Sequence, residues 1–227
     1  MGTAELLDLF FPRRCPFCGE VNLSDLPCEH CQQTLHWLTG QTAHSKVEYI
    51  KTTVSALGYQ GAVRNGVIGF KFHGKLARAK PFCLLVAQCV RDHYDEAFDL
   101  ISWPSLSAKR RRERGYDQAQ RLAQVVAKSR GMRATKLFTK EDRPAQSGLT
   151  DPAARRANVL GAYRLLEPKA VEGKRILLID DVVTTGATLS ECARVLLTAG
   201  AERVCAATLA KAGLGKDKKP QKPCPRG

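Results

Sequence analysis

Short apolar runs alternate with longer amphipathic stretches over most of the chain after residue 53, and this alternation predicts strands and helices in turn. The apolar runs predict strands at residues 54–59, 98–103, 135–140, 161–166, 176–179 and 203–210. The amphipathic stretches predict helices at residues 61–72, 81–90, 117–131 and 187–200, with a further short helix opening at Asp151-Pro152. The chain therefore resembles an α/β protein in its order of elements.

The run at 176–179 is apolar at every position, which is typical of a strand that is covered on both faces. A loop, an amphipathic helix and the strand at 203–210 follow it, and together they form a strand–helix–strand unit. The pattern predicts a parallel sheet flanked by helices. In such sheets ligands bind where the strands end and the helices begin.

Polar residues with suitable chemistry leave the sheet at that edge. Two acidic residues follow the apolar run, and a Thr-Thr-Gly-Ala-Thr string leads into the next helix. Helix N-terminal amides, threonine hydroxyls and a glycine suit a phosphate group, whereas the carboxylates suit the hydroxyls of a sugar. We therefore expect a ribose 5-phosphate site made by Asp180, Asp181, Thr184, Thr185, Gly186, Ala187 and Thr188.

Two Cys-x2-Cys pairs, separated by nine residues, mark the N-terminal part of the chain. Four thiolates at this spacing predict a structural zinc site, with ligands Cys15, Cys18, Cys28 and Cys31. Metal binding would supply the folding energy of so short a segment. A redox dithiol pair, an iron–sulfur cluster and disulfides are the alternatives. Four further cysteines lie in apolar segments and are expected to be buried, at positions 83, 89, 192 and 205.

The chain carries a formal net charge of +14, which favours a polyanionic partner such as nucleic acid. Residues 213–227 hold five basic residues and one acidic residue, so most of the excess belongs to the rest of the chain. Basic side chains also crowd a segment after residue 108 that we expect to be a loop. Its residues Lys109, Arg110, Arg112 and Arg114 suit a pyrophosphate or a nucleic-acid backbone, and a solvated charged loop is the alternative.

The string ILLIDDVVTTGAT resembles the motif of type I phosphoribosyltransferases that binds 5-phosphoribosyl 1-pyrophosphate (PRPP). The wider chain resembles the ComF family of late-competence proteins, with its GntX-type relatives. The resemblance rests on the cysteine module and on the strings KFHGK, RRRERGYDQAQRLA and RPAQSGLTDPAARRANVLGAY. It implies a parallel sheet with PRPP at its C-terminal edge, Mg²⁺ accompanying the pyrophosphate, and a basic segment near the pyrophosphate end.

One position departs from the purine-salvage members of that superfamily, which often have an aspartate where this chain has Thr184. A threonine does not act as a base near neutral pH, so a 6-oxopurine salvage role is disfavoured. Three functions stay open: handling of single-stranded DNA in natural transformation with competence-machinery partners, phosphoribosyl transfer to an unidentified acceptor, and PRPP sensing without turnover.

The organisation expected from these features is a zinc module with its linker at 1–45, a phosphoribosyltransferase-like domain at 46–212 and a basic disordered tail at 213–227. The chain has no apolar run of transmembrane length, and its N-terminus lacks the pattern of a signal peptide. We therefore expect a cytoplasmic protein without membrane insertion.

Overall fold

The computed structural model describes residues 14–22, 27–72, 79–142 and 159–213. The short helix expected at Asp151-Pro152 and the basic tail from residue 214 on lie outside these residues. Within the described ranges no helix is long and apolar enough to cross a membrane.

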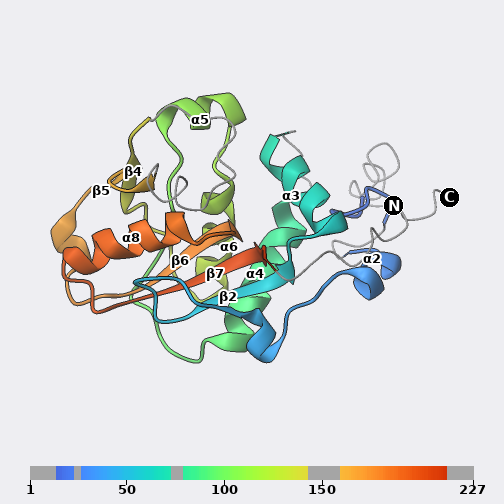
Figure 1. The fold of residues 1–227 in the computed structure, drawn as a ribbon, viewed down its shortest axis with the longest axis horizontal. Coiled ribbons are helices and arrows are strands. Elements are labelled where there is room, and N and C mark those ends of the chain that lie inside the picture. Colours follow the sequence, from blue (N-terminus) through green and yellow to red (C-terminus); the bar gives the residue numbers. More distant parts are fainter. Residues whose placement is uncertain (1–13, 23–26, 73–78, 143–158, 214–227) are drawn as a thin grey trace.

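A five-stranded sheet in the order β1-β2-β7-β6-β3 forms the centre of the molecule (Figure 1). Its strands β2, β7, β6 and β3 are mutually parallel, and the short β1 adds an antiparallel edge. The bounds of the strands are β1 His44–Ser45, β2 Thr53–Gly58, β3 Leu100–Ser102, β6 Arg175–Val183 and β7 Arg203–Lys211. The predicted fold class, a parallel sheet flanked by helices, is confirmed.

Alternate residues of β6 face two different cores. Leu177 and Ile179 belong to the core that β6 shares with α4 (Ala79–His93) and α6 (Gln118–Ser129). Ile176 and Leu178 pack in the second core, with residues of α8 (Ala187–Thr198). The strand is therefore buried on both faces, as its continuous apolar run predicts.

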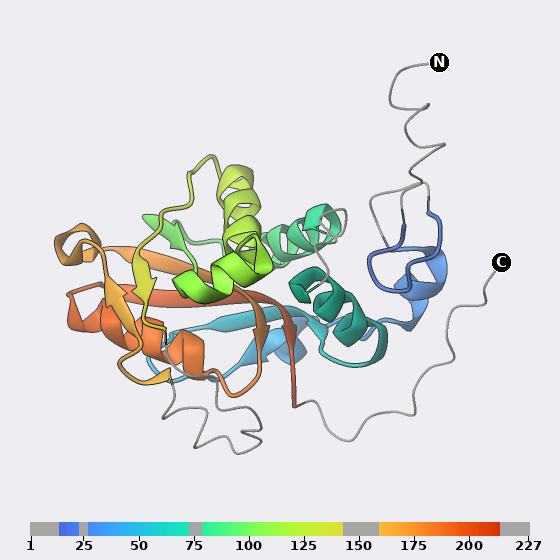
Figure 2. The ribbon, with the colours of Figure 1, turned by 90° about the horizontal axis from the view of Figure 1, so that it is seen from above.

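Smaller elements surround the sheet. A separate two-stranded antiparallel sheet, β4 (Phe138–Lys140) with β5 (Tyr163–Leu165), lies beside α8, and a short 3-10 helix η3 (Pro168–Val171) precedes β6 (Figures 1 and 2). Helix α3 (Gly61–Phe72) follows β2. At the N-terminal end lie α2 (Glu29–Thr34) and the 3-10 helix η1 (Gly40–Ala43).

The basic segment is a helix, α5 (Ala108–Arg114), and the expectation of a loop there is wrong. Ser107 caps its first turn by accepting a hydrogen bond from the Arg110 amide at 3.4 Å, and Gly115 ends it in the left-handed conformation at φ +77°. None of its residues is buried. A helix with no buried face has no apolar periodicity to reveal it.

Strand β6 also continues further than its apolar run. It extends through Asp180 and Asp181 to Val183, because these residues keep their register with β7, where Asp180 lies opposite Thr208. The two acidic residues therefore belong to the C-terminal part of β6 rather than to the loop that follows it.

Candidate functional site

A pocket of about 180 Å³ opens where β6 passes into α8, and we call it the phosphate pocket. Its walls are the end of β6, the connecting loop and the first turn of α8, together with Val159. In the described part of the chain the amides of Thr185, Gly186 and Thr188 have no hydrogen-bond partner, and the Ala187 amide donates only to the Thr185 hydroxyl at 3.4 Å. These N–H groups at a helix N-terminus can bind an anion by donating hydrogen bonds to it.

Gly186 shapes the loop. Its φ of +74° lies in the left-handed region, and a Cβ atom built on it would lie 3.1 Å from both methyl groups of Val47. Only glycine combines this conformation with this close approach. The turn from strand to helix is thereby fixed at the wall of the phosphate pocket.

The two aspartates differ in their surroundings. Asp180 lines the phosphate pocket, and its Oδ1 accepts a hydrogen bond from the Asp181 amide at 2.8 Å. Burial, and then the negative charge of Asp181, raises the pKa of Asp180 to about 7. Asp181 is itself buried, and its Oδ1 lies 2.8 Å from the Lys71 ammonium.

A second pocket, of about 250 Å³, lies next to the first, and we call it the charged pocket. Asp180, Thr184 and Thr188 line both pockets, so the two pockets are adjacent. The ionisable side chains that line the charged pocket, in addition to the two aspartates of β6, are Tyr59, Lys71, Arg110, Arg114, Asp117, Lys140 and Tyr163. The two adjacent pockets therefore offer an anion site in one and a group of cations in the other.

Some basic side chains of α5 line the charged pocket, and the others are exposed on the surface. Arg110 and Arg114, four residues apart on one face of the helix, line the charged pocket. Lys109 and Arg112 do not line it; they are exposed, as is Arg111. Partial burial lowers the pKa of Arg114 despite the nearby charge of Asp181. The four basic residues expected to act together are thus two pocket residues and two surface residues.

Sequence reasoning missed Lys140 and Tyr163. The Lys140 ammonium lies 4.8 Å from the centroid of the Tyr163 ring, and both side chains line the charged pocket. Burial, and then the charge of Arg110, lowers the pKa of Lys140. No motif includes Lys140, and Tyr163 is only the last residue of the string RPAQSGLTDPAARRANVLGAY, which assigns it no role. Both lie on short strands outside the main sheet.

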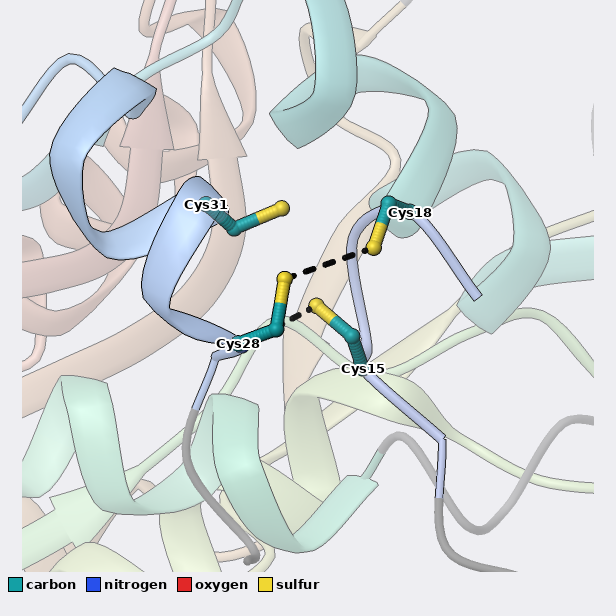
Figure 3. A group of neighbouring side chains, drawn as sticks. All are labelled: Cys15, Cys18, Cys28 and Cys31. Atoms are coloured by element: carbon teal, nitrogen blue, oxygen red, sulfur yellow. Dashed lines mark hydrogen bonds between the residues drawn. The ribbon is translucent and has the colours of Figure 1, made fainter. Parts of the chain in front are cut away.

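The four cysteines of the N-terminal segment gather into one cluster (Figure 3). Their sulfur atoms all lie within 4.8 Å of one another, with 3.6 Å between those of Cys18 and Cys28. A tetrahedral zinc ion with bonds of about 2.3 Å places its sulfur ligands about 3.8 Å apart. The Cys28 amide also donates to the Cys15 sulfur at 3.4 Å. The donor set and its spacing fit one tetrahedral metal ion.

The other predicted cysteines lie apart from this cluster. Cys83, Cys89, Cys192 and Cys205 are all buried free thiols. Burial raises the pKa of Cys83 and of Cys89 to about 12, so they are neutral and packed as apolar side chains. Cys224 lies outside the described residues.

Protein-family models match both the N-terminal cysteine segment and the C-terminal part of the chain. Residues 113–226 match the model of the phosphoribosyl transferase domain, and residues 6–43 match that of the double zinc ribbon domain. The chain is 30% identical over 197 residues to the DNA utilization protein YhgH of Escherichia coli O157:H7, covering 84% of this chain and 80% of that protein.

Two further relatives show the same extent of similarity. Competence protein ComFC of Bacillus subtilis strain 168 is 28% identical over 195 residues, which are 82% of this chain and 72% of that protein. YhgH of Salmonella typhi is 34% identical over 195 residues, which are 84% of this chain and 80% of that protein. The similarity in each case spans far more than the strand–loop–helix unit of β6 and α8.

Proposed function

Because the chain belongs to the ComF family, we propose that it is a competence-type protein whose phosphoribosyltransferase domain binds PRPP and which handles single-stranded DNA. The observation that carries the first part is the adjacency of the two pockets. Amides at the start of α8 that have no partner among the described residues suit the 5-phosphate. The carboxylates of β6 suit the ribose hydroxyls, and Arg110 and Arg114 suit the pyrophosphate.

Magnesium would bind together with PRPP, because the ligand would supply most of its coordinating oxygens. Mg²⁺ prefers oxygen ligands and keeps several waters, so the pyrophosphate would hold most of it and a β6 carboxylate would complete the shell. The structural metal would be zinc at the four cysteines. Its role would be to hold the N-terminal segment folded, since four thiolates leave no position open for chemistry.

Calorimetric titration with PRPP and Mg²⁺ tests the sugar-phosphate site. We expect the double change Asp180→Asn and Asp181→Asn to weaken binding by about 10- to 100-fold, the usual effect of losing hydrogen bonds to charged groups. Asp95→Asn, at an exposed acid outside both pockets, is the matched control. Unchanged affinity of the double variant would refute the site.

The proposed binding of single-stranded DNA is supported by the positive charge of the chain and by the exposed basic side chains on α5. Lys109, Arg111 and Arg112 project from α5 into solvent beside the charged pocket, and the chain as a whole is strongly basic. Its relatives carry the names DNA utilization protein and competence protein. Binding of single-stranded oligonucleotides that weakens steeply with salt is the expected result.

Phosphoribosyl transfer is the second candidate, and the room beyond the sugar site favours it. The Tyr163 ring and the partly buried Lys140 line the charged pocket, where an acceptor would lie. Consumption of PRPP that depends on an added base or amine would establish turnover, whereas binding without consumption would leave a PRPP-sensing protein.

A further inference from the structure

The first turn of the cysteine module presses against the middle of helix α3. A Cβ atom built on Gly66 would lie 2.9 Å from the carbonyl oxygen of Pro16, 3.2 Å from Phe82 and 3.3 Å from Phe17. The rings of Phe17 and Phe82 also pack with centroids 5.3 Å apart. Residues 16 and 17 lie between the first two cysteines, so the backbone that places the sulfur atoms is the backbone that touches α3 (Figures 1 and 3).

The C-terminal end of α3 is held from the other side by the segment that opens α6. The Tyr116 hydroxyl donates a hydrogen bond to the carbonyl oxygen of Phe70. The Gln118 side-chain amide donates to the carbonyl oxygen of Lys71 at 3.2 Å. These bonds satisfy carbonyl groups that a helix end otherwise leaves unpaired. They also assign a physical role to the RGYDQ string, which places both donors at the end of α3.

The residue at that helix end is the one that reaches the sugar-phosphate site. The Lys71 ammonium lies 2.8 Å from Asp181 Oδ1, with side-chain exposures of 22% and 11% for the two residues. Burial opposes the charge of Lys71, but the carboxylates of Asp181 and Asp180 outweigh it and its pKa is raised. Lys71 therefore stays protonated and offsets the repulsion between two adjacent carboxylates.

We propose that the four-cysteine module is a positioning element of the sugar-phosphate site: it fixes α3, and α3 in turn holds Lys71 against Asp181. This inference rests on the proposed function, because it assigns Asp181 to the ribose hydroxyls. Lys71 is a positioning residue that holds the Asp181 carboxylate in place as an acceptor for the sugar hydroxyls. The module thereby contributes to ribose recognition without touching the ligand.

Two ligands separate this role from a loss of folding. Inorganic phosphate has no sugar hydroxyls for the β6 carboxylates to bind, whereas ribose 5-phosphate needs these carboxylates. We expect Lys71→Met to weaken ribose 5-phosphate binding by about 10-fold or more while the affinity for inorganic phosphate stays unchanged. Lys71→Arg keeps the charge and should restore most of the binding. A general loss of structure would lower both affinities together.

The contact of the module is tested by Gly66→Ala, with Asn65→Ala as the control. Asn65 is exposed on the same helix, one residue away. Alanine favours a helix over glycine by about 1 kcal/mol, so a loss of affinity in Gly66→Ala cannot come from weaker helix formation. We expect Gly66→Ala to lower the affinity for ribose 5-phosphate several-fold, with inorganic phosphate affinity and bound zinc unchanged, and Asn65→Ala to behave as wild type.

The outcomes are distinguishable from those of the proposed function. If the wild-type chain binds ribose 5-phosphate, but Lys71→Met and Gly66→Ala bind it equally well, the positioning role is overturned and the proposed function stands. If the wild-type chain binds inorganic phosphate no more weakly than ribose 5-phosphate, the sugar site itself is refuted and the positioning role falls with it.

Discussion

Gly186 lies against Val47, and the two residues fix the entrance of α8 between them. The space that a Cβ atom would occupy is 3.1 Å from both Val47 methyl groups, and the glycine has a φ of +74°. Val47 comes from the segment after β1, far from Gly186 in the sequence. The conformation of the phosphate loop therefore depends on a contact with the edge of the sheet.

Gly186→Ala should lower the free energy of unfolding for two reasons. The left-handed backbone costs alanine about 1–2 kcal/mol, and overlap with Val47 adds about 1–3 kcal/mol. Gly173→Ala is a matched control, because Gly173 also has a positive φ, +66°, but has open space around its Cβ position. Urea denaturation of both variants measures the difference. Equal losses in the two would show that the Val47 contact carries no strain.

The raised pKa of Asp180 predicts a pH dependence of stability. A carboxyl group in the unfolded chain titrates near pH 3.9, whereas burial and then the charge of Asp181 raise the pKa of Asp180 in the fold to about 7. Between these values the native state holds a proton that the unfolded state has released. This contribution to stability is therefore lost as the pH rises from about 4 to about 7.

Asp180→Asn removes that titration and should flatten the dependence. We expect the variant to gain stability relative to wild type between about pH 5 and about pH 8, as measured by chemical denaturation at both values. Asp95→Asn, at an exposed acid, should run parallel to wild type. A constant difference between wild type and Asp180→Asn across this range would contradict the raised pKa.

The exposed and the pocket-lining basic residues of α5 should affect DNA binding and PRPP binding separately. Replacing the outward pair by Lys109→Gln and Arg112→Gln should reduce the salt dependence of single-stranded DNA binding by about 1.4 in the logarithmic slope, which corresponds to two lost phosphate contacts. PRPP affinity should change little. Replacing the inward pair by Arg110→Gln and Arg114→Gln should have the larger effect on PRPP.

The control for charge alone is the pair Lys128→Gln and Lys136→Gln, exposed residues outside α5. Filter binding over a series of salt concentrations gives the slopes. If this pair reduces the slope as much as the outward pair does, α5 is not the contact surface for DNA.

Removal of one cysteine ligand should release the metal. Cys28→Ser leaves three thiolates, and we expect the bound zinc to fall from about one ion per chain to well below that, with loss of stability. Cys89→Ala, at a buried thiol outside the cluster, should keep its zinc and lose stability only through the cavity. Atomic absorption on the purified proteins measures the metal, and wild-type protein without zinc would refute the site.

The parts of the fold with a buried face were predictable from the sequence. The run at 176–179 indicated a strand because all its residues are apolar, and the helix that follows was visible through its apolar spacing. Helix α5 was missed because none of its residues is buried, although Ser107 and Gly115 are typical capping residues. The extension of β6 through the aspartates depends on pairing with β7, which local composition does not contain.

The candidate site shows the same limit. The threonines, the glycine and the aspartates are adjacent in sequence, so their chemistry could be inferred together. The pairing of Lys71 with Asp181 joins α3 to the end of β6, and only the topology brings these residues together. The string KFHGK carries a family resemblance, but it does not indicate which carboxylate Lys71 contacts.

The cysteine module shares one apolar core with α4 and α6, to which it contributes Cys15, Phe17, Cys31 and Leu35. This shared core limits the exchange of modules between related proteins. The zinc ribbon and the sheet are not interchangeable parts joined by a tether. A ribbon transplanted from a relative would have to bring the ring that packs on Phe82, and its host would need a residue as small as glycine at position 66. The two parts should accordingly melt in one cooperative transition and diverge in evolution as a single unit.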